Sequence, residues 1–163
     1  MTVLGIDPSL SSTGYAVIEN RKIIASGKIQ TNSSNGDTDT RIQLIIKELI
    51  IPASLHNIDA VMMEDGFSGV NIGGSLKLAE LRGAIIFYFK YNGIKVVHKQ
   101  PKEIRKILGL KGNAKKEEVA LALQNMYPNL KNEVGEYSDK ANKNKTSDIY
   151  DAISIGLSYF NEI

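Results

Sequence analysis

The sequence predicts an α/β fold in which a mixed five-stranded central sheet carries helices on both faces. Three observations support this prediction. The first 31 residues hold short β-rich runs separated by turn residues, helical and strand patterns alternate over the middle of the chain, and the chain ends in a helical pattern. We expect residues 1–163 to form one domain, because 163 residues with 42% hydrophobic side chains are enough for a single core.

The N-terminal segment predicts three consecutive strands. Residues 2–7 are a short apolar run that ends at Asp7, and the turn-rich sequence PSLSSTG follows it. Residues 15–20 and 22–31 are β-rich runs that are also bounded by turn residues. Short connections of this kind favour antiparallel neighbours at the start of the sheet.

Isoleucine and leucine at helical spacing predict a helix over residues 40–56, which Pro52 ends or kinks near its end. Residues 58–64 then predict a buried strand, and the glycine-rich segment 65–75 predicts a surface loop. In chain order, the remaining predicted elements are helix 76–91, strand 94–99, helix 101–108, helix 114–125 and helix 147–160. The segment 127–145 is polar and lacks periodicity, so we expect a partly disordered loop there.

The composition excludes several classes of protein. The chain has no cysteine, which rules out disulfides, thiolate zinc sites and a cysteine nucleophile, and suits a reducing cytoplasm. His56 and His98 are the only histidines, so we expect any metal to be bound by carboxylates. The start of the chain lacks the pattern of an export signal, and no apolar stretch reaches 18 residues. We therefore expect a cytoplasmic protein that does not bind membranes.

Positive charge is concentrated in one part of the chain. The segment 95–116 contains eight lysine or arginine residues and a single acidic residue, Glu103, although the formal net charge of the whole chain is only +2. A basic block on an otherwise acidic chain is typical of a nucleic-acid-binding face beside a carboxylate-rich site. A solvated lysine-rich face explains the charge equally well.

Four acidic residues lie where active sites form in α/β proteins. Asp7 and Glu64 end predicted strands, and Asp148 and Asp151 are three residues apart near the start of the last predicted helix, so they share a face of it. Several carboxylates that converge from separate elements are what a pair of hard divalent cations requires for phosphoryl transfer. This pattern predicts a metal-dependent phosphodiesterase.

Each acid also has an ordinary structural explanation. In these alternative explanations, Asp7 would begin an Asx-type turn before Pro8, and Glu64 would be a surface charge at a strand end. Asp148 would cap its helix or lie in its first turn. Asp151 is hardest to explain in this way, because it lies in an apolar run and a partly buried acid normally has a partner or a metal.

Four segments in order resemble the RuvC family, the Holliday-junction resolvases of the RNase H-like (retroviral integrase) superfamily. These segments are GIDPSLSSTGYAVI, VMMEDGF, EIRKILGLKGNAKKEEV and SDIYDAISIG, and together they cover nearly the whole chain. The resemblance implies an RNase H-like fold, a homodimer, paired cuts in opposing strands of branched DNA, and roles in DNA recombination and repair. It also implies a site that binds Mg²⁺ or Mn²⁺, with two ions expected, through Asp7, Glu64, Asp148 and Asp151.

The resemblance further implies residues that contact DNA. Phe67 matches an aromatic residue that stacks near the junction crossover, and Arg105 and Lys116 match basic residues that contact phosphates of the scissile strand. Exposed aromatics stack on unpaired bases, although Phe67 folding back onto the core is an alternative. Lys106 and Lys115 adjoin the two basic residues and are equally good candidates on sequence alone.

Some positions leave alternatives open. Asp65 competes with Glu64, but adjacent residues of a strand face opposite sides of a sheet, so one of them at most faces Asp7. We choose Glu64 because it matches the family motif. The chain departs from that pattern at Ser9, where glycine is usual, and at Ile149–Tyr150, where small residues are usual.

Two other functions compete with junction cleavage. One is a branched-DNA-binding protein of the same fold that has lost cleavage, which the four retained acids argue against. The other is an actin-like phosphate-binding domain, which would need a second lobe that this chain lacks. The abundance of Lys, Asn and Ile suits a phage or a low-GC bacterium, hence the cytoplasm of a host in the first case. The sequence does not identify a helicase partner.

Overall fold

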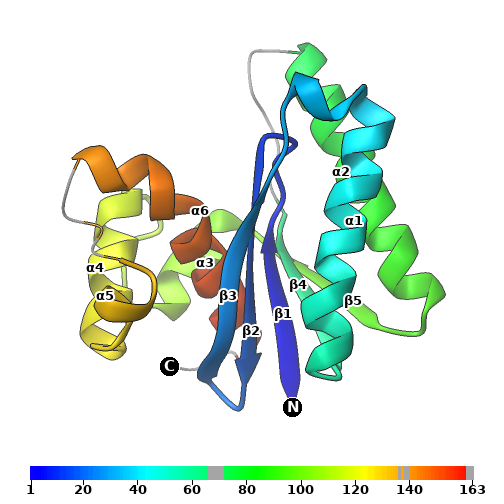
Figure 1. Ribbon diagram of the computed structural model, residues 1–163. Helices are drawn as coiled ribbons and strands as arrows, with labels where there is room; N and C mark the ends of the chain where they lie inside the picture. Colours follow the sequence, from blue (N-terminus) through cyan, green and yellow to red (C-terminus); the bar gives the residue numbers. More distant parts are fainter. Residues whose placement is uncertain (66–71, 136, 138–139, 161–163) are drawn as a thin grey trace.

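A five-stranded mixed sheet forms the centre of the computed structural model, with helices on both faces (Figure 1), as the sequence predicts. The structure describes residues 1–65, 72–135, 137 and 140–160. The strand order is β3-β2-β1-β4-β5. In the described part of the chain, no helix is both long enough and apolar enough to cross a membrane.

The first three strands form an antiparallel meander, and the last two run parallel to β1. Their bounds are β1 (Thr2–Asp7), β2 (Ser12–Glu19), β3 (Lys22–Gln30), β4 (Ala60–Glu64) and β5 (Lys95–Lys99). Asn20 and Arg21 join β2 to β3 with φ angles of 47° and 68°, the left-handed conformation that a two-residue hairpin turn requires. In the centre of the sheet, β1 and β4 are almost fully buried because helices cover both sides.

Two long helices cover one face of the sheet (Figure 1). They are α1 (Thr38–Leu55), which follows a short 3₁₀ turn, η1 (Ser33–Asn35), and α2 (Ile72–Tyr91). Asp37 caps α1, its side chain accepting a hydrogen bond from the Thr40 amide at 2.9 Å. Pro52 lies inside the last turn, and the helix ends three residues after it. The apolar side chains of both helices pack against alternate residues of β1, β2 and β4.

The C-terminal helix covers the other face, over β1 and β2 (Figure 1). The elements on this side are α3 (Pro101–Ile107), α4 (Lys116–Met126), α5 (Leu130–Glu133), α6 (Lys140–Leu157) and the 3₁₀ turn η2 (Ser158–Phe160). α6 lies unusually close to the strands, because a Cβ atom added to Gly5 would lie 2.5 Å from the Gly156 nitrogen. Glycine at these crossing points is therefore required by the close approach of the two backbones.

The sequence prediction for 127–145 is wrong in part. Instead of one loop, α5 forms within the segment and α6 begins at Lys140. Leu130 and Tyr137 are buried in the core beneath α4 and α6, and the rings of Tyr137 and Tyr150 meet edge to face with their centroids 5.6 Å apart. Tertiary packing of a few apolar residues thus stabilises structure in the described parts of a segment whose composition is otherwise polar.

Candidate active site

Asp7 and Glu64 lie side by side at the ends of neighbouring parallel strands. Ile6 pairs with Met63 in the register of β1 and β4, so the next residues, Asp7 and Glu64, end the two strands together. Strand alternation places both on the α6 side of the sheet, since Met62, two residues before Glu64, packs against α6 there. Both acids end strands, as the sequence predicts, and the parallel pairing of β1 and β4 brings them to the same edge of the sheet.

Gly14 positions the two aspartates of α6 beside Asp7. Gly14 pairs with Asp7 in the antiparallel register of β1 and β2. A Cβ atom on Gly14 would lie only 2.5 Å from the carbonyl carbon of Asp148, so the α6 backbone rests directly on β2 at this point. Asp148 and Asp151 follow each other by about one helical turn and lie on one face of α6. Helix α6 begins at Lys140, so Asp148 is neither an N-cap nor a first-turn residue.

The four acids interact electrostatically, as the raised pKa values of three of them and their causes indicate. Burial, followed by the charge of Asp151, raises the pKa of Asp7 from 3.8 to about 7. Burial also raises the pKa of Glu64 and of Asp151, and nearby basic groups only partly oppose this. Asp148 contributes a further negative charge that acts on Asp7 and Asp151. The site therefore gathers more negative charge than its surroundings neutralise.

Two of the basic residues singled out by the sequence lie next to these acids. The Lys116 ammonium forms an ion pair with Oδ2 of Asp151, and although burial lowers its pKa, the charge of Asp151 holds it above the usual value. The Arg105 guanidinium lowers the pKa of Glu64 and of Asp151, and its buried Nε has no hydrogen-bond partner among the described residues. A guanidinium beside a carboxylate cluster can donate charge-assisted hydrogen bonds to a phosphate oxygen.

The other two basic candidates lie on the exposed surface. Lys106 is in the last turn of α3, and Lys115 precedes α4, where its backbone amide donates to the Glu118 carboxylate at 2.7 Å. The structure therefore separates residues that the sequence could not tell apart. Arg105 and Lys116 lie beside the acids, whereas their sequence neighbours Lys106 and Lys115 lie on the exposed surface.

The neighbours of Glu64 have different environments. Asp65 is exposed and its Oδ2 accepts a hydrogen bond from Gln100 Nε2 at 2.9 Å, while Glu64 is half-buried beside the other acids. Phe67 lies outside the described residues, so its stacking role stays a prediction. The Arg82 side chain of α2 donates to the Glu64 carbonyl at 2.6 Å and holds the end of β4 in place.

The donor set suits a hard divalent cation, although its present arrangement does not enclose one. Among the described residues, no three acidic or histidine side chains are grouped closely enough to bind a single ion. The four carboxylates are nevertheless oxygen donors whose negative charges lie close together, and the Lys116 ammonium neutralises this charge only in part. A cation at this site would compete with Lys116 for Asp151, and the carboxylates would have to turn toward it.

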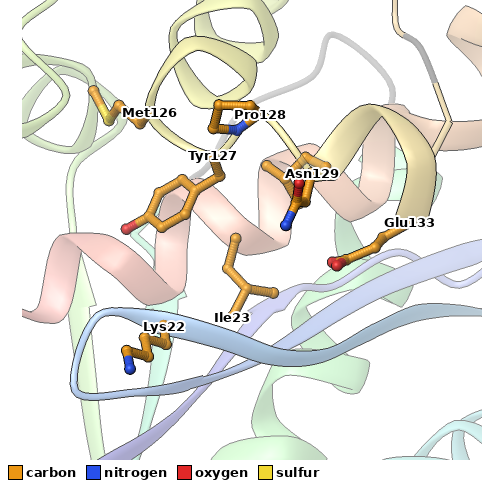
Figure 2. A pocket seen from close by; sticks show the side chains of 8 residues that line it. Lys22, Ile23, Met126, Tyr127, Pro128, Asn129 and Glu133 are labelled. Carbon is orange, nitrogen blue, oxygen red and sulfur yellow. The ribbon is translucent and has the colours of Figure 1, made fainter.

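A separate hollow of about 300 Å³ lies away from the acids (Figure 2). Lys22 and Ile23 of β3 form one side of it, and the connection from α4 to α5 forms the other. The Tyr127 hydroxyl donates to the Arg21 carbonyl at 2.8 Å and joins the two sides. None of the four acids lines this hollow, so it is distinct from the candidate active site.

Sequence reasoning missed Gly14, Ser12 and Arg82. Gly14 and Ser12 belong to the GIDPSLSSTG segment, where glycine and hydroxyl residues near a strand end were a signal of close packing and side-chain hydrogen bonds. Nothing in the sequence marks Arg82, because its function depends on where α2 meets the end of β4.

The raised pKa of Asp7 predicts a pH-dependent stability. An acid whose pKa is higher in the folded chain binds more protons when folded, so its effect lowers the free energy of unfolding as the pH rises from about 4 to about 7. Asp7→Asn removes this effect. In metal-free buffer at pH 8 we expect the variant to be more stable than the parent by up to about 4 kcal/mol. Urea denaturation at pH 4 and pH 8 checks this, and an equal difference at both pH values would contradict it.

Comparison with known proteins identifies the family. The profile of the family described as "Crossover junction endodeoxyribonuclease RuvC" matches residues 3–159. A protein of that name from a Nitratiruptor species is 30% identical over 163 residues, covering 98% of this chain and 95% of the relative. Another, from Prosthecochloris aestuarii, is 29% identical over 161 residues, covering 96% of this chain and 80% of the relative.

Solved structures show the same fold. A structure described as T. thermophilus RuvC in complex with Holliday junction substrate superposes with a TM-score of 0.77, at 21% identity and covering 98% of this chain and 93% of that one. This likeness confirms the RNase H-like fold that the motifs imply. The four ordered motifs and the match over nearly the whole sequence agree, and the chain belongs to the RuvC family of crossover junction endodeoxyribonucleases.

Proposed function

We propose that this protein is a structure-selective endodeoxyribonuclease that resolves four-way DNA junctions by metal-dependent hydrolysis of phosphodiester bonds. The observation that carries the proposal is the cluster of Asp7 and Glu64, at the ends of the central strands, with Asp148 and Asp151 of α6; burial and neighbouring negative charge raise the pKa of Asp7, Glu64 and Asp151. Membership of the family supports this activity, and the T. thermophilus relative was solved with a Holliday junction substrate. A catalytically inactive junction-binding protein is the second candidate.

The four acids are the proposed metal ligands. Two Mg²⁺ ions, with Mn²⁺ as a substitute, would supply Lewis acid chemistry that activates water and stabilises the leaving oxygen of an in-line displacement. Asp7 and Glu64 at the ends of two strands and Asp148 and Asp151 on one helix would hold these ions. Arg105 and Lys116 bind and orient the phosphate that is attacked, because their positive charges lie beside the acids that would otherwise repel it. Phe67 is proposed to stack on a base near the junction crossover.

Arg105, Lys106, Lys115 and Lys116 are proposed to line the DNA path. We expect junction affinity to fall linearly with salt on logarithmic axes, and each lost phosphate contact to reduce the slope by about 1. Neutralising Arg105 and Lys116 together should therefore reduce the slope by about 2 on all sequences alike. Fluorescence anisotropy from low to moderate salt measures this. Lys47→Gln, on α1 at the opposite face of the sheet, is the control. An unchanged slope in the double variant would identify the basic block as a solvated face.

A homodimer is proposed because one four-acid site cuts one strand at a time, whereas a junction has an approximate two-fold axis. The sequence suggests apolar positions of α2 as the interface. Phe87 and Tyr91 stack there with ring centroids 5.7 Å apart while 70% and 80% exposed, and Leu76 lies on the same face and is 60% exposed. Apolar side chains gathered on an exposed helix face are typical of a protein interface.

The function is tested on a supercoiled plasmid that extrudes a cruciform. With Mg²⁺ we expect paired nicks that linearise this plasmid, while the same plasmid relaxed beforehand stays uncut. Phe87→Glu should sediment as a monomer and only nick the plasmid, whereas Ile24→Glu on the edge strand β3 should behave as the parent. Junction binding without cleavage in Mg²⁺ or in Mn²⁺ would favour the catalytically inactive alternative. A parent protein that sediments as a monomer and only nicks the plasmid would refute the proposed dimer.

A further inference from the structure

A serine of β2 contacts one of the proposed metal ligands directly. Ser12 Oγ donates a hydrogen bond to Asp148 Oδ2 at 2.5 Å, across 136 residues of sequence. The other carboxylate oxygen, Oδ1, is 3.3 Å from the Ser147 hydroxyl, its immediate neighbour in α6. Of these two contacts, the one from Ser12 is short and comes from another element of the fold. A hydrogen bond to an ionised carboxylate at this distance is of the strong, charge-assisted kind.

The two partners are held at fixed positions by their backbones. Ser12 lies two residues before Gly14 in β2 and on the same face of the sheet, and Gly14 is the point at which α6 rests on the strand at Asp148. The backbone of Ser12 pairs with Gln30 of β3. A side chain of one carbon and one hydroxyl has few rotamers, so the position of Oγ is determined closely by the strand.

Hydrogen bonds also hold the turn before Ser12 in place. The Thr13 hydroxyl donates to the Ser9 carbonyl at 2.7 Å, and the Ser9 amide donates back to that hydroxyl at 3.2 Å. Arg41 of α1 donates to the Leu10 carbonyl at 3.0 Å. The segment that connects Asp7 to Ser12 is therefore anchored to the rest of the fold, and Ser12 presents its hydroxyl from a rigid support.

We infer that Ser12 is a positioning residue for Asp148: its hydroxyl holds the carboxylate in the orientation in which Asp148 contributes to binding a divalent cation. The inference rests on the proposed function. Without the hydroxyl, Asp148 turns among several rotamers, and each cation that binds must order it again. Hydrogen-bond partners that orient metal ligands in this way change metal affinity or activity by about 10- to 100-fold when they are lost.

The test compares two side chains of the same shape. Ser12→Val and Ser12→Thr add equal bulk, but only threonine keeps the hydroxyl, and Ser12→Ala removes the hydroxyl with no added bulk. We expect Mn²⁺ affinity, measured by calorimetry on the protein without DNA, to fall by about 10- to 100-fold in the Val and Ala variants and to stay within about threefold of the parent in the Thr variant. Ser11→Val is a location control, because Ser11 is exposed and its hydroxyl contacts Ser9.

Two further measurements separate positioning from general damage. The Val and Ala variants lose one charge-assisted hydrogen bond, so their thermal midpoint without metal should fall by only a few degrees, in a transition that stays cooperative. Their junction affinity in EDTA should be unchanged, and high Mn²⁺ should restore most of the cleavage rate. Parent-like affinity in the Val and Ala variants, or the same loss in the Thr variant, would overturn the role of Ser12. Asp148→Asn separates the two levels of the argument. If Asp148→Asn loses Mn²⁺ affinity while the Ser12→Val and Ser12→Ala variants keep it, this inference alone is overturned. If Asp148→Asn keeps the Mn²⁺ affinity of the parent, the proposed metal site is overturned and this inference with it.

Discussion

Replacing any one of the four clustered acids by its amide is expected to lower the rate of junction cleavage by at least about 10³-fold. The reason is that each carboxylate helps to hold metal ions, which stabilise the transition state by several kcal/mol. The variants are Asp7→Asn, Glu64→Gln, Asp148→Asn and Asp151→Asn. Junction affinity should be retained or increased, since removing a negative charge also reduces repulsion of the phosphate backbone. Single-turnover cleavage with saturating protein, together with binding in EDTA, measures both quantities.

Asp65→Asn is the matched control for Glu64→Gln. The two acids are adjacent in sequence, but Asp65 is exposed and pairs with Gln100, whereas Glu64 lies with the other acids. We expect the Asp65 variant to cleave within about threefold of the parent, the effect of an exposed charge outside a site. Normal cutting by Glu64→Gln, or equal loss in both variants, would contradict the assignment of Glu64.

Gly14→Ala should also lower the rate of junction cleavage strongly, although the substitution changes no reactive group. The new methyl group would lie 2.5 Å from the carbonyl carbon of Asp148, so α6 and its two aspartates must move away from Asp7 by an ångström or more. A displacement of about 1 Å within a catalytic arrangement costs about 100-fold in rate. Overpacking at this point should also reduce the free energy of unfolding by about 1–3 kcal/mol or more. Cleavage rates and urea denaturation measure the two effects.

Gly27→Ala is the control for this substitution. It makes the same change in the neighbouring strand β3, but the added methyl group would meet the ring end of Tyr15, 2.7 Å from its hydroxyl, rather than a backbone. A side chain can rotate away from such a contact, so we expect cleavage within about threefold of the parent. Similar behaviour of the two glycine variants would show that the contact between β2 and α6 does not position the acids.

Local patterns were sufficient for most of the secondary structure. Three predicted elements correspond to observed ones within a few residues: the strand that ends at Asp7, the helix that contains Pro52 and the strand at 94–99. The reason is that the buried sides of a strand or helix determine the spacing of apolar residues along the sequence. The prediction failed around Leu130 and Tyr137. There, ordering comes from contacts with α4 and α6, which no local pattern records.

Taken alone, the sequence determined which residue types are available for chemistry, the order of the strands and helices, and membership of the RuvC family, since all of these depend on identity and spacing along the chain. Tertiary structure decided which residues meet. It placed Arg105 and Lys116, rather than their neighbours, beside the acids, brought Ser12 to Asp148, and seated α6 on Gly14. These outcomes depend on how closely two backbones approach and on the burial that follows, and both are properties of the assembled fold.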